Sequence, residues 1–177
     1  MRTLLALCLL VAAVSGLSAA DYMTKDGTKL PAFEELAKLN GDAAKGQTFF
    51  MTFCFMCHQV KGQGIDFGPN LTEVGTRLPK DKLFESIVNP SAVIAQGFDT
   101  VMLTLEDGST PIGIVASEDK DQISMKAIGG VVTKYAKADV TARAKLPMSQ
   151  MLPNLQANMT QQDLVDLVAY LATLKKP

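Results

Sequence analysis

The stretch Phe53-Cys54-Phe55-Met56-Cys57-His58 decides how this sequence is interpreted. It holds two of the three cysteines and the single histidine of a 177-residue chain. The third cysteine, Cys8, lies in an N-terminal segment that we expect the mature protein to lose. Cys54, Cys57 and His58 are then the only strong soft-metal ligands left, so the sequence almost completely specifies any site built on them.

The order Cys-x-x-Cys-His is the attachment signature of c-type haem. Its two thiols are spaced to meet the two vinyl groups on one face of a porphyrin, and the next residue sends its imidazole to the iron. The motif occurs once. We therefore expect one haem c, covalently attached through Cys54 and Cys57, with its iron bound by His58.

Three other interpretations of the motif remain open. A thioredoxin-like dithiol is expected at a helix N-terminus after a strand, whereas residues 46–53 have the pattern of a helix that runs into the motif. A structural zinc site needs four ligands, and the motif supplies three unless a carboxylate helps. A disulfide between Cys54 and Cys57 would close so short a loop that it would constrain little of the unfolded chain.

Residues 1–20 are predicted to be a secretory signal peptide. Arg2 precedes an apolar stretch from Leu4 to Leu17, and small residues lead to a cleavage site after Ala20. A retained membrane anchor is the alternative, but an apolar stretch this short falls below the ~18 residues that span a bilayer. We expect a periplasmic or secreted bacterial protein without a stable membrane span.

Composition narrows the range of partners. An apolar fraction of 47% and a charged fraction of 20% are typical of one compact domain, or of one domain that carries a smaller module. The net charge of −1 offers no basic surface for nucleic acid, and the absence of Trp disfavours a platform for stacking bases. The oligomeric state does not follow from the sequence.

Helices are expected on both sides of a strand-rich stretch. Their predicted ranges are 33–40, about 42–54, 80–88 and 160–174. Thr160 and Asp163 have the spacing of a capping box, and an apolar stripe follows from Leu164 to Leu174. The last helix is therefore the clearest prediction.

Residues 98–140 have the pattern of a small antiparallel β module. Two strand-like runs, 100–105 and 112–116, flank the turn Asp107-Gly108, and two more, 122–127 and 131–135, are joined at Gly129-Gly130. We expect these four runs to form one ordered sheet within the helical domain.

The second axial ligand of the iron cannot be another histidine. Met, a weaker ligand such as Lys, or water remains. Met51 and Met56 stand too close to the motif to reach the opposite face easily. Three methionines lie far downstream, near a proline-punctuated loop that precedes the last helix: Met148, Met151 and Met159.

Several segments together resemble class I c-type cytochromes. They are residues 46–50, the motif itself, Gly68-Pro69-Asn70-Leu71 and a downstream Met before a terminal amphipathic helix. Residues 85–91, 97–139 and 149–155 further resemble a haem-binding cytochrome c domain common in secreted planctomycete and verrucomicrobial proteins. The resemblance covers about residues 42–175.

The resemblance implies a fold and a domain layout. The fold class would be mainly α, the class I cytochrome c arrangement around one haem, with a small antiparallel β module inserted before the distal Met loop. Residues 21–41 would be an N-terminal extension, and residues 42–177 the cytochrome c domain that carries the β module over 98–140.

The resemblance also implies roles for individual residues. Cys54 and Cys57 would form thioethers and His58 would be the proximal ligand. The carbonyl of Pro69 would accept a hydrogen bond from the imidazole and raise its basicity. Met151 would be the distal ligand, with Met148 as the alternative, because Leu152 separates Met151 from the proline that often follows the ligand directly.

A haem with both axial positions filled transfers single electrons. We therefore expect an electron-transfer protein, not an enzyme, that carries electrons between a donor and an acceptor redox protein. Two alternatives stay open: a haem peroxidase-like enzyme with a displaced Met, and a haem-containing partner-binding module of a larger redox complex.

Overall fold

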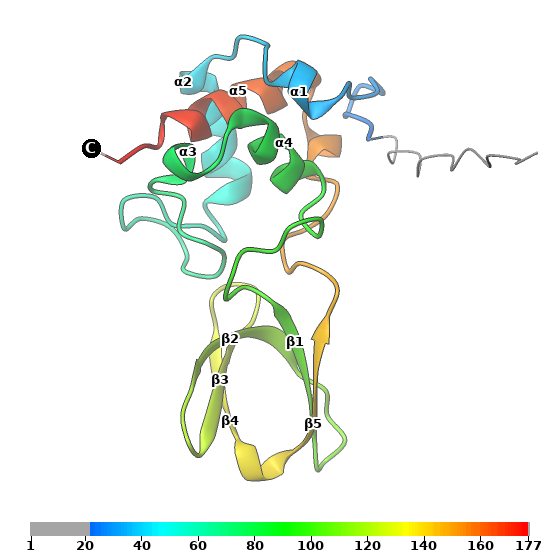
Figure 1. The fold of residues 1–177 in the computed structure, drawn as a ribbon, viewed down its shortest axis with the longest axis vertical. Helices are drawn as coiled ribbons and strands as arrows, with labels where there is room; N and C mark the ends of the chain where they lie inside the picture. The colour runs from blue at the N-terminus through cyan, green and yellow to red at the C-terminus, as the bar shows by residue number, and fades with distance from the viewer. Residues whose placement is uncertain (1–21, 177) are drawn as a thin grey trace, which may run out of the picture.

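Helices and strands occupy opposite ends of the molecule in the computed structural model, which describes residues 22–176 (Figure 1). The predicted signal peptide lies outside the described residues. Across residues 22–176, no helix has the length and apolar character needed to cross a bilayer.

The helical end is built from short helices and one long one. They are α1 (Phe33–Leu36), α2 (Ala43–Phe49), the π-helix η1 (Phe50–Cys54), α3 (Val74–Arg77), α4 (Lys80–Val88), the 3-10 helix η3 (Leu155–Asn158) and α5 (Gln161–Thr173). The side chain of Asp42 caps α2 by accepting from the backbone of Ala44 and Lys45. Thr160 and Asp163 form the predicted capping box of α5, which is confirmed.

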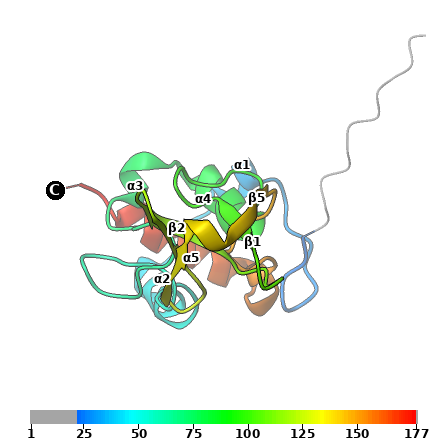
Figure 2. The ribbon, with the colours of Figure 1, turned by 90° about the horizontal axis from the view of Figure 1, so that it is seen from below.

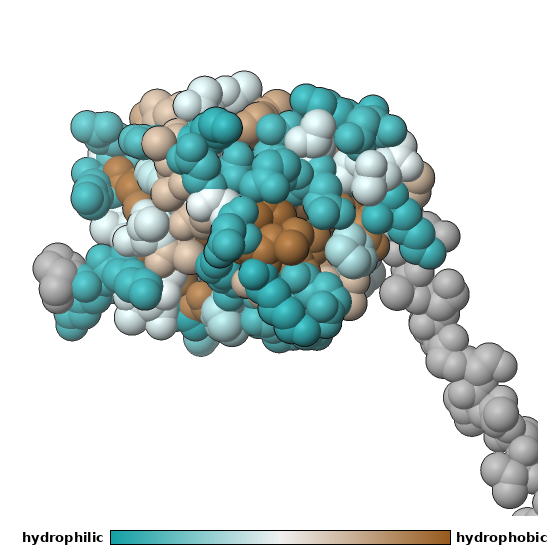
Figure 3. Space-filling view, turned by 90° about the horizontal axis from the view of Figure 1, so that it is seen from above, coloured by the Kyte–Doolittle hydropathy of each residue, from teal (hydrophilic) through white to brown (hydrophobic). Residues whose placement is uncertain are grey.

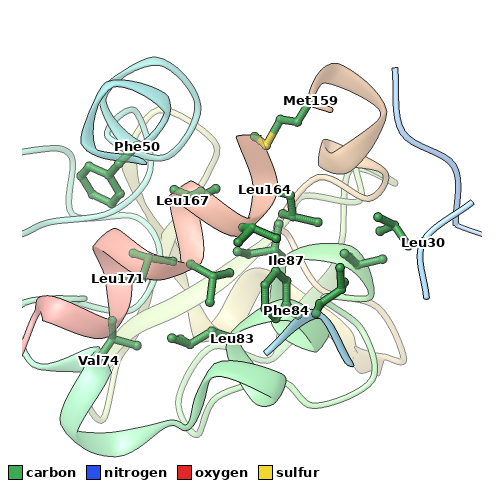
Figure 4. Packing of buried hydrophobic residues seen from close by; sticks show 14 of the residues in the cluster. Leu30, Phe50, Val74, Leu83, Phe84, Ile87, Met159, Leu164, Leu167 and Leu171 are labelled. Carbon is green, nitrogen blue, oxygen red and sulfur yellow. The ribbon is translucent and has the colours of Figure 1, made fainter. Parts of the chain in front are cut away.

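Helices α2 and α5 cross at Gly46. A Cβ on this residue would lie 1.9 Å from the carbonyl oxygen of Asp166, so only glycine permits the crossing. The apolar stripe of α5 then packs between α2 and α4, with Leu164 and Leu167 fully buried against Phe50 and Phe84 (Figure 4). Segments on both sides of the strands thus share one core.

The strands form a five-stranded antiparallel sheet in the order β4-β3-β2-β1-β5. Their bounds are β1 (Thr100–Leu105), β2 (Ile112–Glu118), β3 (Gln122–Lys126), β4 (Val132–Ala136) and β5 (Val140–Leu146). The predicted turns at Asp107-Gly108 and Gly129-Gly130 connect β1 to β2 and β3 to β4, as expected from their glycines.

The sheet curls so strongly that its two edge strands approach each other. In a flat sheet β4 and β5 would lie about 19 Å apart, but only the 3-10 helix η2 (Lys137–Asp139) joins them, and so short a link spans about 14 Å at most. An irregularity in the pairing of β2 with β3 bends β2 after Val115. Strands that are not neighbours therefore share a second apolar cluster, which contains Leu103 of β1 and Ile123 of β3.

A small ion-pair network closes the end of the sheet remote from the helices. Glu118 of β2 pairs with Lys137 of η2 at 2.7 Å and with Arg143 of β5 at 2.8 Å. Both attractions lower the pKa of Glu118, with the hydrogen bond from Lys137 as the main cause. These contacts join strands that the backbone ladder does not pair directly.

The expectation of a mainly α fold was wrong. Of the described residues, 32% are helical and 22% are in strands, and the strands form a five-stranded antiparallel sheet. The reason is β5, which extends the sheet to Leu146, beyond the predicted module. Its residues alternate between apolar and polar from Val140 to Leu146, but most of its side chains are exposed, and the strand is rich in Ala, Arg and Lys, which favour helices over strands.

The sheet extends away from the helical end (Figure 1), so in the view from below it stands in front of the helices (Figure 2). The opposite, upper side is mainly hydrophilic, with a limited apolar area near its middle (Figure 3). Two segments connect the helical end to the sheet, residues 89–99 and residues 147–154.

Candidate functional site

A π-helical turn leads the chain into the Cys-x-x-Cys-His motif. Phe55 donates its backbone N–H to the carbonyl of Phe50, five residues earlier, at 3.0 Å. The backbone N–H groups of Cys57 and His58 then both bond to the carbonyl of Cys54, at 3.0 and 2.9 Å. π-helical turns are frequent at functional sites, and this one places Cys54 at the C-terminal end of a helix.

The loop that follows folds back onto the motif. Phe67 and Gly68 donate their backbone N–H groups to the carbonyl of Cys57, at 3.3 and 2.7 Å, and Ile65 donates to the carbonyl of Phe55. Phe67 is buried, which anchors the loop. The motif is thus held by hydrogen bonds from both sides.

His58 presents one ring nitrogen to the protein and keeps the other free for a ligand. Its Nδ1 lies 2.7 Å from the carbonyl oxygen of Pro69. A carbonyl oxygen only accepts, so Nδ1 carries the proton and the lone pair of the neutral ring is on Nε2. Burial lowers the pKa of His58, and the bond to Pro69 partly opposes this, so the ring is neutral at pH 7. A neutral, oriented imidazole is the form that binds metals.

Gly68 lets the His58 ring lie against the backbone. A Cβ at this position would stand 2.6 Å from Cε1 of the imidazole. Any other residue would therefore push the ring away from the carbonyl of Pro69. In the sequence, Gly68 was placed in a segment that resembles the family but was given no role of its own.

The two cysteines are free thiols held in their neutral form. Burial raises the pKa of Cys54 to about 12, with a smaller contribution from the nearby Cys57, and burial also raises the pKa of Cys57. Disulfide exchange uses the thiolate. The surroundings of these thiols therefore disfavour the dithiol interpretation of the motif.

The zinc interpretation lacks a further ligand. Within residues 22–176, no cluster of three or more His, Cys, Asp or Glu side chains is arranged to hold a metal ion. The described protein groups thus form no ready-made metal centre of the kind that a structural zinc ion needs.

The downstream methionines have different surroundings. Met159 is fully buried, and its side chain packs within the helical core. Met148, in contrast, is 52% exposed. Met151 is half-buried and packs against the same core as Cys54. Its backbone N–H donates to Oγ of Ser149 at 3.1 Å. Of the three, Met151 combines a fixed backbone with a side chain that is neither buried in the core nor fully in water.

These residues fit a covalently bound haem by the chemistry of their donor groups. Two neutral thiols, a neutral imidazole with a free Nε2 and a half-buried thioether are the groups that such a haem uses. The structure brings Cys54, Cys57, His58 and Pro69 together in one short loop, and it brings Met151 to the same helical core from beyond the sheet.

Two further residues of the site were missed in the sequence. Thr100, the first residue of β1, and Ser91 hold the loop that contains Met151, through bonds to Met148 and Ser149. The partners stand 48 and 58 residues apart in the chain. No local pattern could have paired them.

Comparison with known proteins finds a match of part of the chain to a family model. Residues 43–104 match the family model described as Cytochrome c. The match spans the Cys-x-x-Cys-His motif, Pro69 and α4, and it ends within β1. No curated protein matches the chain. The matched segment supports a c-type cytochrome with a haem-binding, electron-transfer function, and proteins of that family bind haem c covalently.

Proposed function

We propose that this protein is an exported c-type cytochrome with one haem, which passes single electrons between a donor and an acceptor redox protein. Cys54 and Cys57 would hold the haem covalently, and His58 and Met151 would hold its iron. The observation that carries the proposal is the 2.7 Å bond between Nδ1 of His58 and the carbonyl of Pro69. This bond leaves Nε2, in a Cys-x-x-Cys-His motif, directed to an external ligand.

Each residue has a defined task in electron transfer. The bound haem supplies a one-electron couple. Pro69 fixes the tautomer and orientation of His58 and raises its basicity as a ligand. The soft thioether of Met151 favours the ferrous state and so raises the reduction potential. With His58 and Met151 both holding the iron, oxygen and peroxide would find no vacant site there.

The same arrangement favours a carrier over a peroxidase-like enzyme. Peroxide chemistry needs an open axial position and a nearby acid–base group. His58 is the single histidine of the chain, and its ring is engaged with Pro69. No distal histidine can therefore assist such chemistry here.

Export and domain layout belong to the same proposal. Residues 1–20 serve as a signal peptide, and maturation takes place in the periplasm or outside the cell. Residues 21–41 form an N-terminal extension, and residues 42–177 form the cytochrome domain with its inserted sheet. The packing of α4 and α5 in one core supports this layout, because the sheet lies between them in the chain.

Covalent attachment is the test of this function. The full chain, expressed together with periplasmic haem maturation machinery, is expected to keep its haem through denaturation and acid-acetone extraction. Cys54→Ser and Cys57→Ser should each weaken retention, and the double variant should abolish it. Cys8→Ser is the matched control and should leave retention unchanged. Extraction of haem from the unmodified protein, or stoichiometric zinc bound by its thiols, would overturn the proposal.

A further inference from the structure

The loop that carries Met151 is tied to the sheet by one buried hydroxyl. Thr100 begins β1 and is fully buried. Its Oγ1 donates to the carbonyl of Met148 and accepts from Nε2 of Gln150 at 3.4 Å. A single side chain of the sheet therefore contacts the loop at two positions, both within three residues of Met151.

Two further hydrogen bonds connect this anchored segment to the backbone of Met151. The backbone N–H of Ser149, the residue after Met148, donates to Oγ of Ser91 at 3.0 Å. Oγ of Ser149 accepts in turn from the backbone N–H of Met151 at 3.1 Å. The loop is thus tied to the rest of the protein at Met148 and Ser149, and the backbone of Met151 is fixed relative to Ser149.

Thr100 is itself rigidly placed. It lies in a strand with neighbours on both sides, opposite Ile114 of β2 and opposite Leu146 of β5. Leu146 is the last residue of β5, directly before the Met151 loop begins. The hydroxyl therefore meets the loop at the point where the loop leaves the sheet.

The sheet also touches the other wall of the site. Lys126 of β3 pairs with Asp66, in the loop after the motif, at 2.7 Å. A Cβ on Gly130 would meet the side chain of Ile65 at 2.8 Å. Asp66 is exposed, so this ion pair contributes little free energy. The buried Thr100 contact is the stronger of the two attachments.

We propose that Thr100 is a positioning residue for the distal ligand: through its hydroxyl, the sheet holds the 147–153 loop so that the sulfur of Met151 stays on the iron. The inserted sheet then contributes to the haem site by positioning the loop that carries Met151. This inference rests on the proposed function, because it presupposes that Met151 is a ligand.

The test compares holoprotein variants that differ in one hydroxyl. Thr100→Val keeps the shape of the side chain and removes both hydrogen bonds, whereas Thr100→Ser keeps the hydroxyl. Thr104→Val, at the far end of the same strand, is the matched control. Two quantities are measured in the ferric protein: the far-red sulfur-to-iron absorption band, and the rate at which added cyanide displaces the ligand.

We expect Thr100→Val to weaken the far-red band and to speed displacement about tenfold, the factor that corresponds to one ordinary hydrogen bond. Thr100→Ser and Thr104→Val should behave as the unmodified protein. Amide exchange in residues 147–153 should quicken in Thr100→Val alone. A merely structural defect would instead lower the unfolding midpoint of Thr100→Val and Thr104→Val together without changing the displacement rate.

The possible outcomes distinguish a failure of Met ligation from a failure of the role proposed for Thr100. An unmodified holoprotein without the far-red band would overturn Met ligation, and with it the role of Thr100. A normal band in the unmodified protein, with equal displacement rates for Thr100→Val and Thr104→Val, would overturn the role of Thr100 alone. If Thr100→Val does not accumulate, Thr100→Ser and Thr100→Ala form the comparison, because they differ only in the hydroxyl.

Discussion

At the scale of single residues, the candidate site depends on the imidazole nitrogens of His58 and on the thiol sulfurs of Cys54 and Cys57. His58 is neutral because burial disfavours its charged form, and Pro69 decides which nitrogen keeps the lone pair. Cys54 and Cys57 were identifiable from the motif alone, since their spacing is diagnostic. The 2.7 Å bond between His58 and Pro69 followed from the family resemblance, and the contact of the ring with Gly68 required the structure.

The distal ligand can be assigned by two substitutions. Met151→Ala is expected to abolish the far-red band of the ferric protein and to lower the reduction potential, because a soft thioether that favours ferrous iron is lost. Met148→Ala is the control, since that side chain is half exposed to solvent. Absorption spectra and redox titration of both holoproteins provide the measurement. If Met148→Ala produced these changes and Met151→Ala did not, the ligand would be Met148.

At the scale of elements, helices followed from the sequence better than strands did. The capping box and apolar stripe of α5 are local signals, and the structure has both. The helix expected over residues 33–40 is shorter, ending at Leu36. β5 was missed because its place beside β1 depends on partners some forty residues away. Its residues do alternate between apolar and polar, but Ala, Arg and Lys dominate the strand, and these residues favour helices over strands. Strand pairing across such distances is set by tertiary structure.

The cap of α5 should contribute measurably to stability. Thr160→Ala is expected to lower the free energy of unfolding by about 0.5–2 kcal/mol, because the backbone N–H of Asp163 loses its acceptor. Urea unfolding followed by circular dichroism gives the value. Thr173→Ala, at the other end of α5, is the control and should cost less, since its hydroxyl only adds a bond to an exposed carbonyl. Equal losses would show that the cap has no special role.

Acid should weaken the same cap. Partial burial raises the pKa of Asp163, but bonds from the backbone and side chain of Thr160 and from Lys25 outweigh it and hold the pKa below its ordinary value. The carboxylate therefore stabilises the fold above its unfolded pKa, and that contribution is lost as the pH falls toward the folded value. Asp163→Asn should flatten the decline in unfolding free energy below about pH 4. A variant as acid-sensitive as the unmodified protein would contradict this.

At the scale of the whole molecule, the sheet lies in the chain between the two segments that the proposed haem site combines. The chain leaves the helices after α4, forms the sheet and returns through the Met151 loop to η3 and α5. The two ends of the site thus reach the helical core by different routes. The motif comes with α2, and Met151 comes only after the sheet is complete.

Removal of the sheet should separate haem attachment from haem ligation. Replacing residues 100–146 with a short linker is expected to leave the covalent haem in place, because Cys54, Cys57 and His58 are unaffected. The far-red band should disappear and cyanide should bind rapidly, since the loop loses its anchor at Thr100. Shortening only the β1–β2 turn, at residues 106–111, is the control. Full retention of the band without the sheet would make the sheet an independent module.

The pairing of Thr100 with Leu146 also bears on how the chain folds. Phe84 of α4 and Leu164 of α5 belong to one core, yet the whole sheet stands between them in the chain. Bringing such distant segments together costs chain entropy that grows with the length of the intervening loop. Three local hairpins build β1 to β4, and β5 then pairs with β1. Once the sheet has formed in this way, its first and last residues lie side by side, so only two short linkers remain to be ordered. The formed sheet therefore lowers the entropic cost of bringing α4 and α5 together, because the effective loop between them consists only of the two linkers.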